Sequence, residues 1–102
     1  MNVKLQRFLS EFQRIAKVNG VRFWDRPENS SMMTMLKWDE PMVTQNVLLQ
    51  LTENDFLEGP IHQDGYPDAW CFRQNIKGYE VYIKLGMVEK NKRLVYSIRI
   101  IN

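Results

Sequence analysis

The sequence contains almost none of the residues that build disulfides and metal centres. Its 102 residues include one cysteine, Cys71, and one histidine, His62. A single cysteine excludes an intrachain disulfide and a zinc site built from several cysteines. We therefore interpret Cys71 as a small strand residue, with a nucleophile as the weaker alternative. A chain without disulfides fits a reducing cytoplasm, which is the compartment we expect.

Long hydrophobic runs are lacking as well. No apolar stretch approaches the roughly 20 residues that a membrane-spanning helix needs. Residues 1–16 are interrupted by Lys4, Arg7, Glu11 and Arg14, which excludes the apolar segment of a secretory signal peptide. We expect a protein that neither enters nor crosses a membrane.

The composition is otherwise that of an ordinary globular protein. Hydrophobic residues make up 44% of the chain and charged residues 25%, values that argue against disorder. The length suffices for one modest hydrophobic core. We expect a single domain over residues 1–102, with no repeat, low-complexity tract or interdomain linker.

Charge is unevenly distributed along the chain. Residues 1–37 hold seven basic and three acidic residues, residues 38–68 hold seven acidic and no basic residues, and residues 69–102 hold seven basic and two acidic residues. Basic ends can present a positive surface to a phosphate backbone. A mixed, solvated surface is the alternative.

The first part of the chain predicts a helix followed by a short strand. Six apolar residues recur at helical spacing: Leu5, Phe8, Leu9, Phe12, Ile15 and Ala16. They predict an amphipathic helix over residues 3–18, which Gly20 would end by adopting a left-handed conformation. Residues 21–24 are predicted to be a strand and residues 25–31 a loop.

The middle of the chain predicts short helices and another loop. Ser30 or Ser31 could cap a helix over residues 32–38, whose methionines and Trp38 would fill the core. Asp39, followed by Pro41, caps a second helix with a buried face formed by Val43, Val47, Leu48 and Leu51. Thr52 resembles the cap of a further turn, which Gly59-Pro60 would end. Residues 61–68 contain Gly65 and Pro67 and are predicted to be a loop.

The last third predicts three antiparallel strands with one apolar face. Apolar and polar residues alternate on either side of two turns, Lys77-Gly78 and Glu89-Lys90-Asn91-Lys92. The predicted fold class is therefore α+β, in which an N-terminal amphipathic helix and short helices pack on a twisted antiparallel sheet.

The turn lengths also predict which residues lie opposite one another. Pairing Val88 with Arg93 places Tyr82 opposite Arg99 and Lys84 opposite Ser97. Pairing Ile76 with Tyr79 places Arg73 opposite Tyr82 and Cys71 opposite Lys84. The same registers align Phe72, Ile83 and Ile98 on the apolar face, which supports them because a one-residue slip would reverse a strand. A bulge at Gly78 would break the Ile76–Tyr79 pairing.

These registers predict a phosphate-binding site on the polar face. Arg73, Tyr82 and Arg99 would form a row across the strands, with Lys84 and Cys71 beside them. Arginine presents a fixed fork to phosphate oxygens, and nearby cations could lower the pKa of the Tyr82 hydroxyl. The alternative is a solvated sheet face that carries basic residues for solubility.

The segment around His62 permits a second interpretation. His62, Asp64 and Asp68 could bind a divalent ion, although Gly65 and Pro67 explain this stretch more simply as a turn. No phosphate-binding loop, dinucleotide motif or Ser-His-Asp set occurs.

An ordered set of short motifs resembles a known family. From Leu51 to Leu85 the chain reads Leu-Thr-Glu-Asn-Asp-Phe, then Gly-Pro, Asp-Ala-Trp-Cys-Phe and Ile-Lys-Gly-Tyr-Glu-Val-Tyr-Ile-Lys-Leu, and its last strand carries Ser97-Ile98-Arg99. The set spans residues 51–99 and is similar to the MqsR family of toxins. Residues 1–20 agree only in being a helix that ends in glycine.

The resemblance implies a RelE/barnase-like fold and a function. Members of that family are metal-independent endoribonucleases, or mRNA interferases, of type II toxin–antitoxin systems. They cleave mRNA, inhibit translation, need no cofactor and are silenced by a cognate antitoxin protein. Tyr82 matches a tyrosine implicated in activity, and Arg99 stands where the family has Lys or His. Glu58 and Cys71 depart from the family, which has a basic residue and Gln at these positions.

Three hypotheses follow. The first is a metal-free RNA-cleaving toxin in which Tyr82, Arg99, Lys84 and His62 are catalytic, while Arg73, Lys77 and Arg93 contact RNA. The second is a binding module without chemistry, which uses its basic face for RNA or its other surfaces for a protein. The third is a metal-dependent nuclease built on His62, Asp64 and Asp68. Involvement of the ribosome is left open.

Overall fold

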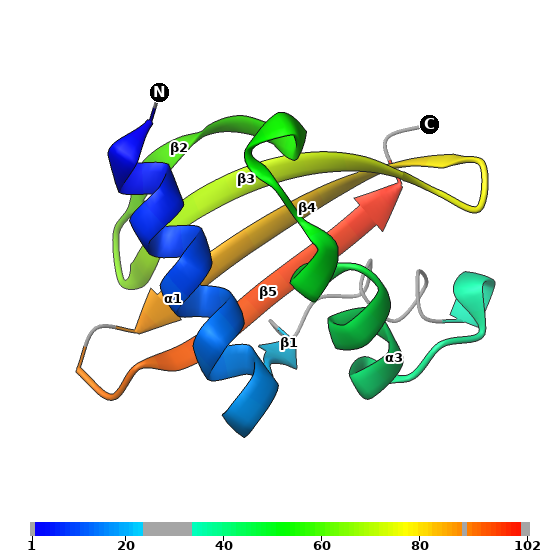
Figure 1. Cartoon of the computed structure of the whole chain (residues 1–102), viewed down its shortest axis with the longest axis horizontal. Helices are drawn as coiled ribbons and strands as arrows, with labels where there is room; N and C mark the ends of the chain where they lie inside the picture. Colours follow the sequence, from blue (N-terminus) through cyan, green and yellow to red (C-terminus); the bar gives the residue numbers. More distant parts are fainter. Residues whose placement is uncertain (1, 24–33, 89, 101–102) are drawn as a thin grey trace.

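The computed structural model describes residues 2–23, 34–88 and 90–100. Helices cover one face of a five-stranded sheet whose strand order is β1-β5-β4-β3-β2 (Figure 1). The helices are α1 (Val3–Asn19) and α3 (Glu40–Asn46), followed by 3₁₀ turns at Leu48–Gln50 and Glu53–Asp55. The strands are β1 (Arg22–Phe23), β2 (Phe56–Gln63), β3 (Tyr66–Ile76), β4 (Tyr79–Val88) and β5 (Arg93–Ile100). The coarse α+β expectation is therefore confirmed.

Helix α1 forms where the apolar spacing predicts it. The Asn2 side chain caps its first turn by accepting a hydrogen bond from the Leu5 amide at 3.0 Å. Gly20 ends the helix with φ at 74°, a left-handed value that suits glycine. One side of α1 is buried in the core, through Leu5, Leu9, Phe12, Ile15 and Ala16.

Helix α3 begins at the predicted cap but is shorter than expected. The Asp39 side chain accepts a hydrogen bond from the Met42 amide at 3.0 Å. The chain leaves the helix at Val47 and continues in a 3₁₀ turn, yet all four residues of the predicted buried face are buried. The Gln13 side-chain amide of α1 donates to the carbonyls of Leu48 at 3.1 Å and Leu51 at 2.9 Å, which secures this segment to α1.

The short helix before Asp39 is confirmed only at residues 34–36, which are helical. Leu36 is buried and Trp38 packs at the edge of the core, but Met35 is 49% exposed, so the expectation that it fills the core is wrong. The proposed caps Ser30 and Ser31, the methionines at positions 32 and 33 and the loop over residues 25–31 lie outside the described residues. So do Trp24, at the end of the predicted strand, and Glu89 of the second turn.

Strands β3, β4 and β5 form the predicted antiparallel meander. Every predicted pair is observed: Ile76 with Tyr79, Arg73 with Tyr82, Cys71 with Lys84, Val88 with Arg93, Tyr82 with Arg99 and Lys84 with Ser97. The β3–β4 register runs without interruption from Ile76–Tyr79 to Trp70–Leu85, so no bulge occurs at Gly78. Phe72, Ile83 and Ile98 are side by side and fully buried under the helices, as predicted.

The prediction of a loop over residues 61–68 is wrong. Residues 56–63 form β2, which pairs antiparallel with β3 at the edge of the sheet, and only the Asp64-Gly65 turn separates the two strands. The register shifts three times along β2, between Phe56 and Glu58, between Glu58 and Ile61, and between Ile61 and Gln63. Pro60 is compatible with this position, because an edge strand leaves part of its backbone unpaired.

The parallel strand pairing at the other edge of the sheet was not predicted. Strand β1 pairs in parallel with β5, through Arg22–Val95 and Phe23–Tyr96. The core lies between the sheet and the two helices and contains Tyr96, Phe12 and Phe72 as its largest fully buried side chains. None of the helices in the described part of the chain has both the length and the apolar character that crossing a membrane requires.

Candidate nucleic-acid interface

The sheet face opposite the helices carries a cluster of polar and charged side chains. We define the Tyr82 cluster as Glu58 on β2, Arg73 on β3, Tyr82 and Lys84 on β4, and Arg99 on β5. Their order follows from the registers: Glu58 lies opposite Cys71, which lies opposite Lys84, while Arg73, Tyr82 and Arg99 form the adjacent row. Residues opposite one another share a face of a sheet, so four strands contribute to one surface.

Tyr82 is the centre of this cluster. Its hydroxyl donates a long hydrogen bond, 3.5 Å, to Oε1 of Glu58. The Arg99 guanidinium carbon lies 5.0 Å from the centroid of the Tyr82 ring, within the range of a cation–π interaction. A carboxylate, a phenol and a guanidinium are thus brought together from β2, β4 and β5, and both charged groups are exposed to solvent.

The electrostatics of Tyr82 differ from the expectation. Burial raises the pKa of the Tyr82 hydroxyl well above its usual value, and the neighbouring Cys71 and Glu58 raise it further. Arg99 lowers that pKa, but its contribution is the smaller one. The predicted lowering by nearby cations is therefore wrong. At neutral pH Tyr82 is a neutral phenol that can donate a hydrogen bond, and it is not a phenolate base.

Arg73 is engaged by a neighbouring carboxylate. Its Nε donates to Oε2 of Glu80 at 2.7 Å, and this contact holds the pKa of the Glu80 carboxyl below its usual value. The ion pair is exposed, with 52% of the Arg73 side chain accessible. Arg73 lies in the predicted row, but Glu80 neutralises much of its charge toward an incoming phosphate.

Lys77 and Arg93, which were predicted to contact RNA, lie outside this cluster. The Lys77 ammonium donates to the Leu36 carbonyl at 3.2 Å and lies 5.0 Å from the Trp38 ring centroid. It therefore joins the β3–β4 turn to the segment before α3. Arg93 lies at the opposite end of the sheet, at the start of β5.

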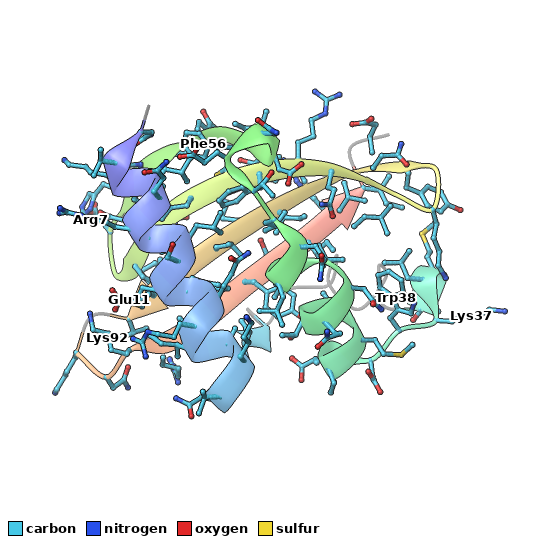
Figure 2. The ribbon with its side chains drawn as sticks, viewed as in Figure 1. Arg7, Glu11, Lys37, Trp38, Phe56 and Lys92 are labelled. Atoms are coloured by element: carbon cyan, nitrogen blue, oxygen red, sulfur yellow. The ribbon has the colours of Figure 1, made fainter. Side chains whose placement is uncertain are left out.

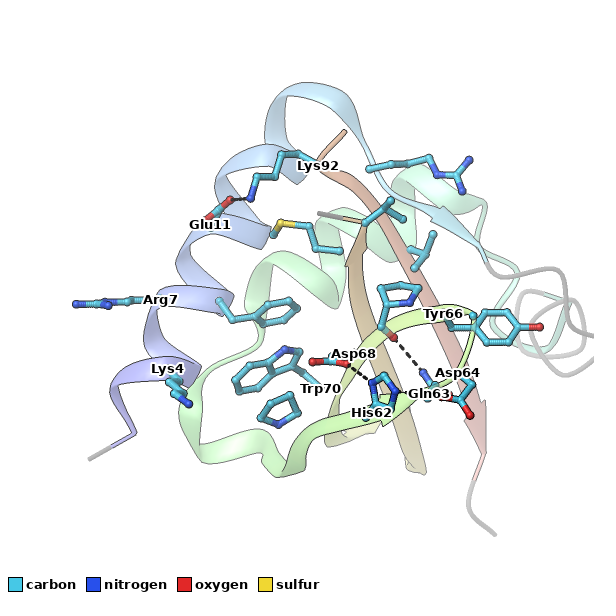
Figure 3. Close-up of a pocket in the computed structure, with 18 residues that line it drawn as sticks. Lys4, Arg7, Glu11, His62, Gln63, Asp64, Tyr66, Asp68, Trp70 and Lys92 are labelled. Atoms are coloured by element: carbon cyan, nitrogen blue, oxygen red, sulfur yellow. Dashed lines mark hydrogen bonds and ion pairs between the residues drawn. The ribbon is translucent and has the colours of Figure 1, made fainter. Parts of the chain in front are cut away.

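His62 is not brought to Tyr82. Its ring nitrogens lie 3.1 Å from Oδ1 of Asp64 and 3.3 Å from Oδ1 of Asp68, at the β2–β3 hairpin (Figure 3). Asp68 shares its strand face with Trp70 and Phe72, which is the face that packs on α1. Arg73 is on the other face and five residues further along β3, which is about 16 Å at the usual rise of a strand. The structure thus separates the predicted histidine from the other predicted catalytic residues.

A metal site at the same hairpin finds no support in the geometry. Among the described residues, no group of three or more His, Cys, Asp or Glu side chains is arranged to hold a metal ion. His62, Asp64 and Asp68 instead bond to one another as an exposed chain of contacts.

The polar face is less open than the alternation of the sequence suggests. Cys71 is fully buried and Ser97 is buried at 8% exposure, although both lie on the same face as Tyr82. This agrees with the interpretation of Cys71 as a small strand residue. Around Cys71 and Ser97 the accessible surface is therefore formed by the longer side chains of the Tyr82 cluster.

Glu58 is the residue that sequence reasoning missed. The sequence around it, with Gly59-Pro60 directly following, favours a turn, and in that interpretation Glu58 is only a surface charge. Its position opposite Cys71 depends on the irregular β2–β3 pairing, which no local pattern reveals. The one available signal was the family resemblance, in which Glu58 marks a change of charge.

Comparison with known proteins identified no relative of this chain. No protein-family model matches the chain, and no curated protein matches it. The case for a function consequently depends on the geometry of the Tyr82 cluster and on the motif resemblance described above.

Proposed function

We propose that the chain is a metal-independent endoribonuclease, the toxin of a type II toxin–antitoxin system, which cleaves mRNA and thereby inhibits translation. The observation that carries the proposal is the convergence of Glu58, Tyr82 and Arg99, with Lys84 beside them. Together they provide a base, a neutral donor and two cations on one accessible surface. A RelE/barnase-like fold, a cytoplasmic location and a cognate antitoxin partner belong to the same proposal.

The chemistry that suits these groups is transesterification at an RNA phosphate. The Glu58 carboxylate takes the proton of a ribose 2′-hydroxyl, and the 2′-oxygen then forms a bond to the adjacent phosphorus. Arg99 and Lys84 stabilise the charge on the phosphorane, and the neutral Tyr82 phenol donates a hydrogen bond to one of its oxygens. The bond to the 5′-oxygen breaks, and this oxygen takes a proton from water. The products are a 2′,3′-cyclic phosphate and a 5′-hydroxyl.

The test is cleavage of a defined single-stranded RNA in EDTA, because chelation removes any metal-dependent nuclease activity. We expect discrete fragments ending in 2′,3′-cyclic phosphate. Glu58→Gln should lower the cleavage rate by roughly 10²- to 10⁴-fold, the range for a positioned proton-transfer group. Tyr82→Phe should lower it by roughly 10²- to 10³-fold, the range for loss of one hydrogen-bond donor to the developing charge. His62→Ala should cleave at the wild-type rate when RNA is saturating, since His62 lies at the β2–β3 hairpin and not beside Tyr82.

Three outcomes would contradict this proposal. Unchanged cleavage in both Glu58→Gln and Tyr82→Phe would remove the assigned roles. Cleavage by the wild type only after Mg²⁺ is added would replace the mechanism with a metal-dependent one. If isolated RNA is not cut, the same variants are compared with translating ribosomes, and absence of cleavage there as well rejects the enzyme.

A binding module without chemistry is the second candidate, and one observation favours it. The raised pKa of the Tyr82 hydroxyl makes this phenol a poor proton donor. In that case the protein would bind RNA with a steep dependence on salt but would leave it intact. Filter binding at several salt concentrations, beside the cleavage assay, separates the two candidates.

A further inference from the structure

A large hollow lies at the end of the sheet that carries the β2–β3 hairpin and the β4–β5 turn, and no residue of the Tyr82 cluster lines it. The hollow is open to solvent and has a volume of about 1120 Å³. It lies between the N-terminal half of α1 and the β2–β3 hairpin (Figure 3). Two stacked aromatic rings form its inner wall: the Phe8 and Trp70 centroids are 4.8 Å apart with 13° between their planes. This volume is slightly above that of ordinary small-molecule sites, which enclose roughly 300–1,000 Å³.

One side of this hollow is basic. Lys4 and Arg7 are exposed on adjacent turns of α1, and no ion pair or hydrogen bond links either side chain to another described residue. Glu11, about one turn after Arg7 on α1, is paired with Lys92 of the β4–β5 turn at 3.3 Å (Figure 2). The α1 side therefore offers two uncompensated cations about one helical turn apart.

The opposite side is acidic and accepts hydrogen bonds. Asp64 and Asp68 each place one oxygen, Oδ1, against a ring nitrogen of His62. Within the described chain the second oxygen of each carboxylate has no partner, and the Asp64 side chain is fully exposed. The hollow thus has cations on one side, an aromatic wall, and carboxylate acceptors on the other side.

We propose that this hollow binds one nucleotide of a single-stranded RNA, as a second site separate from the Tyr82 cluster. The phosphate contacts Lys4 and Arg7, the base lies against the edges of the Phe8 and Trp70 rings, and an exocyclic amino group of the base donates to Asp68 or Asp64. A base is uncharged and carries N–H donors, so it suits the acidic side, while its phosphate suits the basic side. An acidic peptide lacks such donors in its side chains and would meet two carboxylates.

This assignment rests on the proposed function, in which RNA is the ligand, and it adds a preference among the RNA bases. Adenine, cytosine and guanine carry an exocyclic amino group, whereas uracil does not. Bases with an amino group should therefore bind more tightly than uracil.

The test measures binding of fluorescent 2′-O-methyl oligonucleotides, which lack the 2′-hydroxyl needed for cleavage. Oligo(A) should bind more tightly than oligo(U), and Lys4→Gln/Arg7→Gln should weaken oligo(A) binding by roughly 10-fold at low salt. The same double variant should reduce the slope of log affinity against log salt by about 1.4, the value for two phosphate contacts on a single strand. Lys17→Gln, which removes an exposed cation at the other end of α1, is the matched control and should bind as the wild type.

A third variant tests the acidic side. Asp68→Asn keeps the size of the side chain but removes its charge, and it should reduce the preference for oligo(A) over oligo(U) by about 5-fold. Equal binding of oligo(A) and oligo(U) by the wild type would overturn the base contact. Wild-type affinity in Lys4→Gln/Arg7→Gln would overturn the site.

Other ligands give distinct results. Competition by a glutamate-rich peptide at the affinity of oligo(A) would overturn the assignment in favour of a protein partner. Competition by AMP as strong as that by oligo(A) would indicate a free-nucleotide site and overturn the assignment to a strand. Lys4→Gln/Arg7→Gln should weaken oligo(A) binding by the same factor in the wild-type and in the Glu58→Gln background, whereas Glu58→Gln removes cleavage of ordinary RNA. Failure of the proposed chemistry and failure of this site are therefore distinguishable.

Discussion

Strands β2 and β4 belong to the same sheet but are stabilised in different ways. Strand β4 has a partner on each side and buries Val81, Ile83 and Leu85 completely, so its register is determined by core packing. Strand β2 has one partner, no buried residue and three register shifts. The regular strand supplies Tyr82 and Lys84, and the irregular strand supplies Glu58. A candidate site at such a junction combines a half whose register is determined by core packing with a half that is held by its pairing with β3.

The largest expected effect is on the free energy of unfolding, and it distinguishes a core side chain from an edge side chain. Phe72→Ala, in the buried meander, should lower the free energy of unfolding by about 3–5 kcal/mol, because it leaves a cavity among packed side chains. Leu57→Ala, on exposed β2, should change it by less than about 0.5 kcal/mol. Urea denaturation followed by tryptophan fluorescence measures both. Similar losses in the two variants would mean that β2 contributes to the core as β4 does.

A smaller effect is expected from the backbone of β2. A Cβ at Gly59 would lie 2.8 Å from the Ala69 carbonyl oxygen, and its φ of 138° disfavours any side chain. Gly59→Ala should therefore cost roughly 1–3 kcal/mol and, by displacing Glu58, also lower the proposed cleavage. Gly65→Ala is the control, because its φ is also positive but the space around it is open. If the two variants are equally stable and equally active, close packing of β2 on β3 does not position Glu58.

The smallest effect concerns the exposed ion pair of β3 and β4. Arg73 holds the pKa of the Glu80 carboxyl below its usual value, so this pair contributes stability above the unfolded-state pKa and loses it as pH falls through the folded-state value. Arg73→Gln should return the pKa of Glu80 toward its ordinary value, which titration of the Glu80 carboxyl carbon by NMR would show. The unfolding midpoint at neutral pH should hardly change, since exposed pairs contribute little. A Glu80 pKa that does not rise would mean that another group sets it.

The sequence could predict most of the meander and only part of the candidate site. Alternation of apolar and polar residues determines which face of a strand is buried, and the short turns then determine the pairing, so Arg73, Tyr82 and Arg99 were correctly aligned. Both signals are local. They could not show that Glu80 pairs with Arg73, that Lys77 contacts Trp38, or that His62 lies on the far side of the sheet. These contacts depend on side-chain conformation and on segments distant in sequence.

What the sequence by itself determined is therefore the α1 helix, the cap at Asp39, the cap at Thr52, whose side chain accepts a hydrogen bond from the Asn54 amide, and the register of β3 to β5. Each of these follows from residues that are close along the chain. Only the tertiary structure decided that residues 56–63 form a strand, since β2 is held by hydrogen bonds to β3 and not by a buried face of its own. The same pairing brought Glu58 to Tyr82. Burial in the folded sheet also determined the protonation of Tyr82, because desolvation raises the pKa of its hydroxyl more than the nearby Arg99 lowers it.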